Sequence, residues 1–448
     1  MAIQKAGPEP LTDLGAFLEP FGSLMRRSES RETMERYATG LLSDLSRKTA
    51  ADIGRALPGT NDQRLQEFLT NTVWDCGAMD RLRIEYMLRH ASVGGGVLIV
   101  DDTGFPKKGR HSVGVARQYS GTLGRVDNCQ VVVTTHYVDR VFDWPVNARL
   151  YLPKSWAGDA ARRTRTRMPE KIGFRTKGEI ALALIDEAAE AGLTDLLPIV
   201  ADAGYGDQPT FLDGLQSRRR PYVVGLAGTL LFRLAAEVDT DAGNHPPPPY
   251  AGQGRPRKPS TLADRVQPRE ARAILADLPE KAWTRVAWRE GRKGALVKEV
   301  ARVRVHRTGA RGKHLPTTGW LLGERPLPGH AGDVKQYFVW ALDDLTVEDL
   351  IELAHVRWVI ERFYQDAKGE LGLDDYEGRL WTGLHRHIAL VMLAHCFLTL
   401  RQSYGPEGMG TGPPGSEAPD ALAPSAPPTR GFPPSGPKQR GRSAPAGA

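Results

Sequence analysis

Cysteine is scarce in this sequence, and its three copies are far apart. Cys76, Cys129 and Cys396 form no CxxC pair and show no spacing typical of a disulfide framework. The pattern therefore predicts a protein of a reducing compartment, without disulfides and without structural zinc.

Long apolar runs are also lacking. Met1–Pro10 contains no apolar core of a secretory signal. The longest apolar run, Ile388–Leu400, is interrupted by His395 and Thr399, and it is shorter than the about 20 residues that cross a bilayer. We expect it to form a buried helix, and we expect no membrane partner.

The sequence has no GxxxxGK[ST] phosphate loop and no internal repeat, which leaves no sign of that nucleotide-binding class or of a repeat fold. Its 448 residues, 40% hydrophobic and 25% charged, suffice for two or three globular domains. The formal net charge of +7 suits a polyanionic partner, although basic tails contribute to it.

Residues 1–90 are predicted to be helical. Residues 48–57 and 62–69 flank the turn 58–61, in which Asn61 is a natural N-cap. A DNA-binding helix-turn-helix and an ordinary pair of short helices both fit this pattern.

Residues 91–226 show an α/β pattern in which two aspartates follow buried strands. A continuous apolar run ends in Asp101-Asp102-Thr103-Gly104, which predicts a turn, and a second run ends at Asp202. The expected strands are 97–100, 130–139, 146–152, 196–201 and 221–226, with helices at 177–191, where Gly192 is the C-cap, and up to 217. This order indicates a mixed sheet covered by helices, with Asp102 and Asp202 just past strand ends.

The remaining chain divides into three parts. Residues 227–345 read as a β-rich insertion with a basic, proline-rich loop at 246–259. The insertion is expected to hold strands at 286–288, 295–304, 319–322 and 336–342. Residues 346–403 return to a helical pattern, and residues 404–448 are expected to be a disordered, weakly basic tail.

The helix expected at residues 357–368 has two stripes. Its apolar stripe, predicted to face the core, consists of Val356, Ile360, Phe363 and Ala367; its polar stripe consists of Arg357, Glu361, Tyr364 and Lys368. The polar stripe could be a phosphate-handling surface or a surface salt bridge between Arg357 and Glu361.

Three carboxylates, Asp102, Asp202 and Glu361, form the candidate site. Convergent carboxylates without histidine or cysteine suit hard divalent cations, and two such ions about 4 Å apart can activate the attacking oxygen and stabilise the leaving oxygen of a phosphodiester. Asp101 and Asp207 are near-equal alternatives, and Asp366 is a weaker one.

Three histidines, His385, His387 and His395, lie in the last helical segment. An HxH pair can bind metal, but no acidic or cysteine partner stands at ligand spacing. Capping or packing is therefore the expected role.

Three motifs resemble those of DDE transposases of bacterial insertion sequences, specifically the insertion-sequence 701 family within the insertion-sequence 4 superfamily. They are residues 100–109, 200–206 and 357–379, and the likeness spans roughly residues 20–400. The resemblance implies an RNase H-like core interrupted by a β-rich insertion. It also implies that Asp102, Asp202 and Glu361 are the catalytic and metal-binding acids.

The resemblance further implies a set of partners. These are Mg²⁺, with Mn²⁺ able to substitute, and double-stranded DNA as terminal inverted repeats and target, bound by a homodimer in the bacterial cytoplasm. Arg357 and Lys368 would contact phosphates. Lys107, Lys108 and Arg110 would do the same beside Asp102, unless they form a solvated basic loop.

The sequence departs from the family in two places. Arg357, Glu361 and Lys368 match the signature Y-x2-R-x3-E-x6-K, but Ala354 stands at the tyrosine position, which leaves a hairpin intermediate open. The tail does not resemble the helical ending of the family. A base-stacking aromatic in the insertion is implied as well, with Trp320, Phe338 and Trp340 as candidates for stacking or for the core.

The tail leaves two other functions open. One is a catalytically silent DNA-binding regulator derived from a transposase, and the other is a standalone nuclease on the same core.

Overall fold

The computed structural model describes residues 12–404 apart from 92–94, 122–123, 194–196, 242–251, 253–265, 292–293 and 310–313. The expected basic loop at 246–259, except Gly252, and the expected tail after Tyr404 lie outside this part of the chain.

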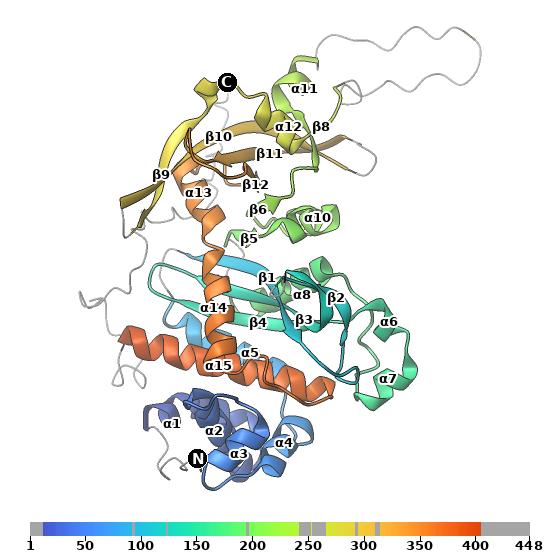
Figure 1. The fold of residues 1–448 in the computed structure, drawn as a ribbon, viewed down its shortest axis with the longest axis vertical. Coiled ribbons are helices and arrows are strands. Elements are labelled where there is room, and N and C mark those ends of the chain that lie inside the picture. The colour runs from blue at the N-terminus through green and yellow to red at the C-terminus, as the bar shows by residue number, and fades with distance from the viewer. Residues whose placement is uncertain are drawn as a thin grey trace, which may run out of the picture.

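One mixed sheet of twelve strands runs through the described part of the molecule (Figure 1). Its order is β2-β3-β1-β5-β6-β12-β11-β10-β7-β8, with β4 on β3 and β9 on β10. The core strands are β1 (Val97–Pro106), β2 (Ala116–Ser120), β3 (Arg125–Val138), β4 (Asp143–Tyr151), β5 (Ile199–Ala201) and β6 (Tyr222–Leu226). Helices flank this sheet, as the predicted RNase H-like α/β arrangement requires.

The first strand differs from its prediction. The turn expected at residues 101–104 is part of β1, which continues to Pro106 because β3 pairs with it along its whole length. Asp102 therefore lies inside a strand and not beyond its end. Strand β2, which pairs with the start of β3, was not predicted either.

Helix α8 (Lys177–Glu190) covers β3 and β4 on one side of the sheet. Thr176 and Glu179 form a capping box at its start, and Gly192, with φ of +99°, lies just past its end, as expected for a helix stop. The helices that follow β5 are α9 (Ala203–Gly206) and α10 (Pro209–Ser217).

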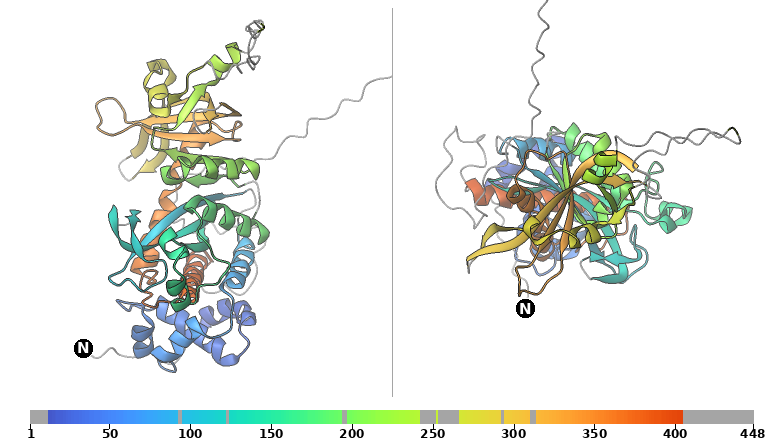
Figure 2. Two further views of the ribbon diagram at one scale, coloured as in Figure 1. Left: turned by 90° about the vertical axis from the view of Figure 1, so that its right-hand side faces the viewer. Right: turned by 90° about the horizontal axis from the view of Figure 1, so that it is seen from above.

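One end of the long axis is formed by the helices α1 (Thr12–Leu18), α2 (Ser28–Leu42), α3 (Ala50–Ala56) and α4 (Asp62–Thr70) (Figures 1 and 2). The next helix, α5 (Cys76–Leu88), lies against α15 (Trp381–Tyr404) and β4. The predicted helix pair is confirmed as α3 and α4, and the Asn61 side chain accepts a hydrogen bond from the Arg64 backbone N–H at 2.8 Å.

Helix α15 (Trp381–Tyr404) packs against β4 on one side and the N-terminal helices on the other. Of the helices that the structure describes, it is the one long and apolar enough to cross a membrane, and 83% of its apolar window is buried inside the protein. The prediction of a buried helix is confirmed, and the helix extends beyond the apolar run on both sides.

The β-rich insertion continues the core sheet. Its strands are β7 (Leu231–Leu234), β8 (Arg269–Glu270), β9 (Thr284–Gly291), β10 (Gly294–Thr308), β11 (His314–Arg325) and β12 (Lys335–Trp340), with helices α11 (Ala235–Asp241) and α12 (Ala271–Ala276). Strand β12 pairs antiparallel with β6 over five residue pairs, so the insertion joins the core through a backbone ladder.

Two consecutive helices return the chain from the insertion to the core (Figure 1). They are α13 (Val347–His355) and α14 (Trp358–Gly369). Three members of the predicted apolar stripe, Ile360, Phe363 and Ala367, are at most 2% exposed. The fourth, Val356, is partly buried and lies at the C-cap of α13, before α14 begins. The burial of the first three seats α14 against β1 and determines where its polar stripe points.

Two histidines of α15 are buried as neutral rings. His385 Nδ1 donates to the Trp381 carbonyl at 2.9 Å, and its Nε2 accepts from the Leu150 backbone N–H at 3.3 Å. His387 lies between the Tyr37 hydroxyl at 2.8 Å and the Gly372 carbonyl at 2.9 Å. The expected packing role agrees with these contacts, and burial lowers the pKa of each ring to about 4.

These rings predict a pH-dependent stability. Between pH 6.5 and 4 the unfolded chain protonates a histidine that the folded chain keeps neutral, so the free energy of unfolding falls as pH falls, by up to about 1.4 kcal/mol per pH unit per histidine. We expect His385→Asn, which retains a donor for the Trp381 carbonyl, to reduce this slope in urea titrations. His330→Asn, at an exposed position, should leave the slope unchanged. An identical slope in all three proteins would contradict the prediction.

Candidate active site

Strand alternation separates the two adjacent aspartates of β1. Asp101 is registered with Thr134 of β3, whose hydroxyl is hydrogen-bonded to the Tyr364 hydroxyl of α14 at 2.5 Å. Asp101 therefore points to the side of the sheet that α14 covers. Asp102 points to the opposite side, since neighbouring side chains of a strand alternate.

Asp102 is held by a cation from α8. Lys177 Nζ lies 2.9 Å from both carboxylate oxygens, and the Tyr205 hydroxyl donates to Oδ2 at 3.3 Å. The Asp102 side chain retains 18% of its exposure. The cation thus neutralises an acid that remains accessible to solvent.

Asp202 follows β5 and stands at the N-cap of α9. The parallel register of β1 and β5 ends at Val100 and Ala201, so Asp101 and Asp202 come next, side by side. Burial raises the pKa of Asp202, and the charge of Asp102 raises it further. The positive charge of Arg357 lowers it in part. Its Oδ1 atom is buried and has no hydrogen-bond partner in the described part of the chain.

Arg357 connects the third carboxylate to the strand. Its guanidinium donates to Asp101 Oδ2 at 2.7 Å and to Glu361 Oε1 at 2.5 Å. The i,i+4 salt bridge considered from the sequence exists, and it extends to Asp101. Burial raises the pKa of Asp101 to about 7, which Arg357 opposes and Asp202 reinforces.

The structure gathers the predicted acids only in part. Asp102 interacts electrostatically with Asp202, whereas Glu361 reaches the strand through Arg357. Among the residues that the structure describes, no group of three His, Cys, Asp or Glu side chains is close enough to hold a metal ion. The expected trio is therefore not assembled as a ligand set here, since Lys177 and Arg357 each hold one of its members.

The donor chemistry nevertheless fits a hard divalent cation. The available ligands are carboxylate oxygens, which Mg²⁺ and Mn²⁺ prefer. The unpartnered, buried Asp202 Oδ1 is an acceptor that such an ion would satisfy. In this structure the positive charge of Lys177 balances Asp102, and the positive charge of Arg357 balances Asp101 and Glu361.

The basic residues of the loop after β1 lie in two different environments. Lys107 Nζ donates to the carbonyls of Asp374 at 3.1 Å and Tyr376 at 2.8 Å, so it stabilises a turn of the protein. Lys108 and Arg110 are exposed, as a DNA contact would require. Lys368 Nζ donates to the Gly104 carbonyl at 3.1 Å, at the end of α14 nearest β1.

The aromatic candidates differ in exposure. Phe338 is fully buried and belongs to the core, and Trp340 stacks on Tyr222 with ring centroids 5.8 Å apart. Trp320 is half-buried, and two guanidiniums, of Arg302 and Arg304, lie over its ring.

Ala354, which stands at the tyrosine position of the family signature, is buried in α13. The nearby Tyr364 is also buried, and its hydroxyl is hydrogen-bonded to the Thr134 hydroxyl.

Two parts of the site were missed from the sequence. Lys177 is the first residue of α8 and lies 75 positions after Asp102, so no local pattern connects them. The separation of Asp101 from Asp102 follows from strand alternation, but the prediction of a turn at these residues concealed it.

Comparisons with known proteins identify the family of this chain. The family model described as DDE superfamily endonuclease matches residues 19–295, a range that contains Asp101, Asp102 and Asp202. A probable transposase for insertion sequence element IS701 from Microchaete diplosiphon is 32% identical over 224 residues, which is 49% of this chain and 56% of that protein. The chain thus matches little more than half the length of this curated relative. Because the family model covers more than half of the chain, the protein belongs to the DDE superfamily endonucleases.

Proposed function

We propose that the protein is a cut-and-paste transposase that nicks DNA phosphodiesters at insertion-sequence ends and joins the 3′-hydroxyl ends to target DNA. The observation that carries the proposal is the group of acids at the β1–β5 edge, together with Glu361 on α14. The likeness to a probable insertion-sequence transposase supports it.

Asp102, Asp202 and Glu361 are the proposed ligands of Mg²⁺, for which Mn²⁺ can substitute. Bound divalent ions would lower the pKa of an attacking water and stabilise the leaving oxygen of the phosphodiester. Asp102 points to the α8 side of the sheet and Glu361 lies on the α14 side, where Asp101 also points. Loading would therefore require Lys177 and Arg357 to release these acids, and it would also require β1 to rearrange near Asp102.

Basic side chains near the acids are proposed to contact DNA phosphates. The planar guanidinium of Arg357 suits bidentate contact with phosphate oxygens. We assign Arg357 and Lys368 to positioning the scissile phosphate, and Lys108 and Arg110 to flanking phosphates. Lys107 would support this loop from within through its two backbone carbonyls.

Recognition of element ends is assigned to other parts of the chain. The N-terminal helices, including α3 and α4, and the insertion are the proposed readers of terminal inverted repeats, and two copies of the chain would act as a dimer on DNA. Trp320 and Trp340 both keep part of their exposure and are the proposed aromatics of the insertion for meeting a base, although two guanidiniums already lie over the Trp320 ring.

A catalytically silent DNA-binding regulator is the second candidate function. One observation favours it: the acids are neutralised by Lys177 and Arg357 and do not form a ligand set within the described residues. Binding of element-end DNA without nicking, in both Mg²⁺ and Mn²⁺, would select this function. Nicking that needs no repeat ends and joins no DNA would instead indicate a standalone nuclease.

Glu361→Gln tests the proposed chemistry. Glutamine keeps an oxygen for Arg357 but loses the negative charge that a metal ligand supplies, so we expect nicking of element-end DNA to fall by at least about 100-fold, equivalent to about 2.7 kcal/mol. DNA binding should persist. Asp366→Asn is the matched control, because Asp366 lies on the same helix with a similar exposure, 52% against 54%. Normal cleavage by Glu361→Gln would end the assignment.

The two aspartates of β1 can be distinguished by the same assay. We expect Asp102→Asn to abolish nicking and to weaken Mn²⁺ binding in calorimetry. Asp101→Asn should lose about tenfold in rate, the effect of a positioning interaction of roughly 1.4 kcal/mol, because Arg357 loses one of its two anchors. The reverse ranking would transfer the first ligand position to Asp101.

A further inference from the structure

A basic connection, defined here as residues 154–177, links β4 to α8. It contains the short helices α6 (Lys154–Ala157) and α7 (Ala160–Arg165), which lie at the side of the sheet (Figure 1). Eight of its residues are Lys or Arg and two are acidic. Sequence analysis assigned it no role, and the proposed chemistry does not use it, apart from Lys177.

Part of this connection forms a pocket with the loop after β1. The cavity measures about 190 Å³ and is lined by Arg110, His111, Trp156, Arg162, Arg165 and Thr166. Three arginines and a histidine therefore line one hollow.

The walls of the pocket are fixed by buried contacts. Trp156, 1% exposed, donates from Nε1 to the Val115 carbonyl at 2.7 Å, and the Arg162 guanidinium lies over its ring at 5.0 Å. The Thr166 carbonyl accepts from the Trp381 backbone N–H at 2.9 Å. The pocket is thus held by the core sheet and by α15.

The positive charge of the pocket is only weakly compensated. Arg162 has an ion pair with Asp159 at 3.4 Å. Arg110 and Arg165 are exposed, and neither forms an ion pair with any residue that the structure describes. A site of this composition attracts an anion, and arginine forks match phosphate oxygens.

The pocket is tied at both ends to the candidate active site. Arg110 follows Asp102 on the same strand and loop, and the basic connection ends at Lys177, which binds Asp102. A ligand in the pocket therefore lies on elements that carry the first proposed acid.

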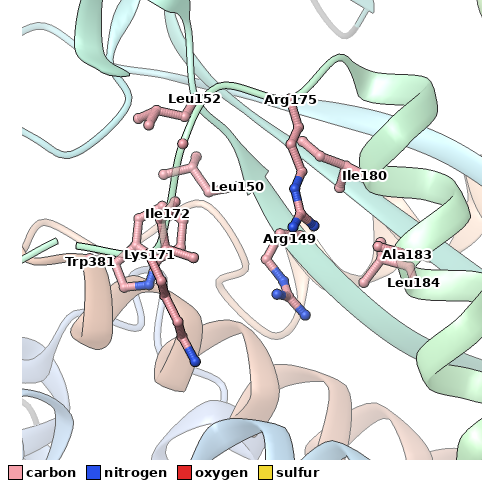
Figure 3. A pocket seen from close by; sticks show the side chains of 11 residues that line it. Arg149, Leu150, Leu152, Lys171, Ile172, Arg175, Ile180, Ala183, Leu184 and Trp381 are labelled. Atoms are coloured by element: carbon pink, nitrogen blue, oxygen red, sulfur yellow. The ribbon is translucent and has the colours of Figure 1, made fainter. Parts of the chain in front are cut away.

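Further cations extend the basic surface. Lys171 and Arg175 of the connection line a second, smaller hollow together with Arg149 (Figure 3). Both are exposed, whereas Arg149 is paired with Glu187 at 2.6 Å. Repeated cations along one connection fit a polymer with repeated phosphates better than a single small anion.

We propose that the pocket of Arg110, Arg162 and Arg165 binds a backbone phosphate of duplex DNA. The inference rests on the proposed function and adds to it a contact that positions the duplex. A contact with a backbone phosphate does not depend on the base sequence, so it would form with element-end and target DNA alike.

The test is the salt dependence of DNA binding by the full chain. Fluorescence anisotropy of a short labelled duplex, titrated over potassium chloride concentration, gives the slope of log affinity against log salt. We expect Arg110→Gln/Arg165→Gln to flatten this slope by about 1 and to weaken binding about tenfold, whatever the duplex sequence. The single variant Arg165→Gln should show the same effect in part, and it changes no residue that the proposed function already assigns to DNA.

The matched control is Arg140→Gln/Arg219→Gln. Both residues are exposed; Arg140 follows β3 at the end where Val97 pairs with Val138, and Arg219 follows α10. An equal slope and affinity in the pocket variant and in this control would overturn the proposal. An inorganic phosphate titration that displaces the duplex from the control, but not from the pocket variant, would support it.

Nicking of plasmid DNA separates this proposal from the proposed function. If the wild type nicks DNA and the pocket variant binds as the control does, the pocket proposal fails alone. If the wild type never nicks DNA but the slope still changes, the proposed function fails alone.

Discussion

Charge neutralisation at one edge of the sheet is the constraint on which the site depends. Burial raises the pKa of Asp101 and of Asp202, and the nearby charge of Asp102 raises both further. Arg357 and Lys177 offset the cost of this negative charge from opposite sides of the sheet. The same two contacts attach α14 and α8 to β1. Loss of either ion pair would therefore disturb both the charge balance of the acids and the packing of that helix.

This balance also sets the condition for activity. Carboxylates that hold cationic side chains cannot at the same time surround a metal ion, and a polyanion supplies an alternative partner for those side chains. DNA phosphates and divalent ions would thus enter the site together, each replacing one half of the existing ion pairs. The basic pocket would bring the first of these partners to the edge of the sheet.

Much of the fold could be predicted from local patterns. The stripe of Ile360, Phe363 and Ala367, the N-cap at Asn61 and the buried strand before Asp101 depend on near neighbours, and each was predicted correctly. The continuation of β1 to Pro106 depends on β3, which is distant in the chain, and it was missed. The contacts of Lys177 with Asp102 and of Arg357 with Asp101 join residues 75 and 256 positions apart, and only the folded chain brings them together.

The pairing of β6 with β12 has a mechanical consequence. Five registered residue pairs fasten the insertion to the catalytic core through backbone hydrogen bonds, while α13 and α14 run alongside as a second link. An insertion attached in this way cannot swing on a flexible tether as an independent lobe. Any closure over a bound duplex must come from twisting of the continuous sheet, and such a twist would be transmitted along β5 and α14 to the acids themselves.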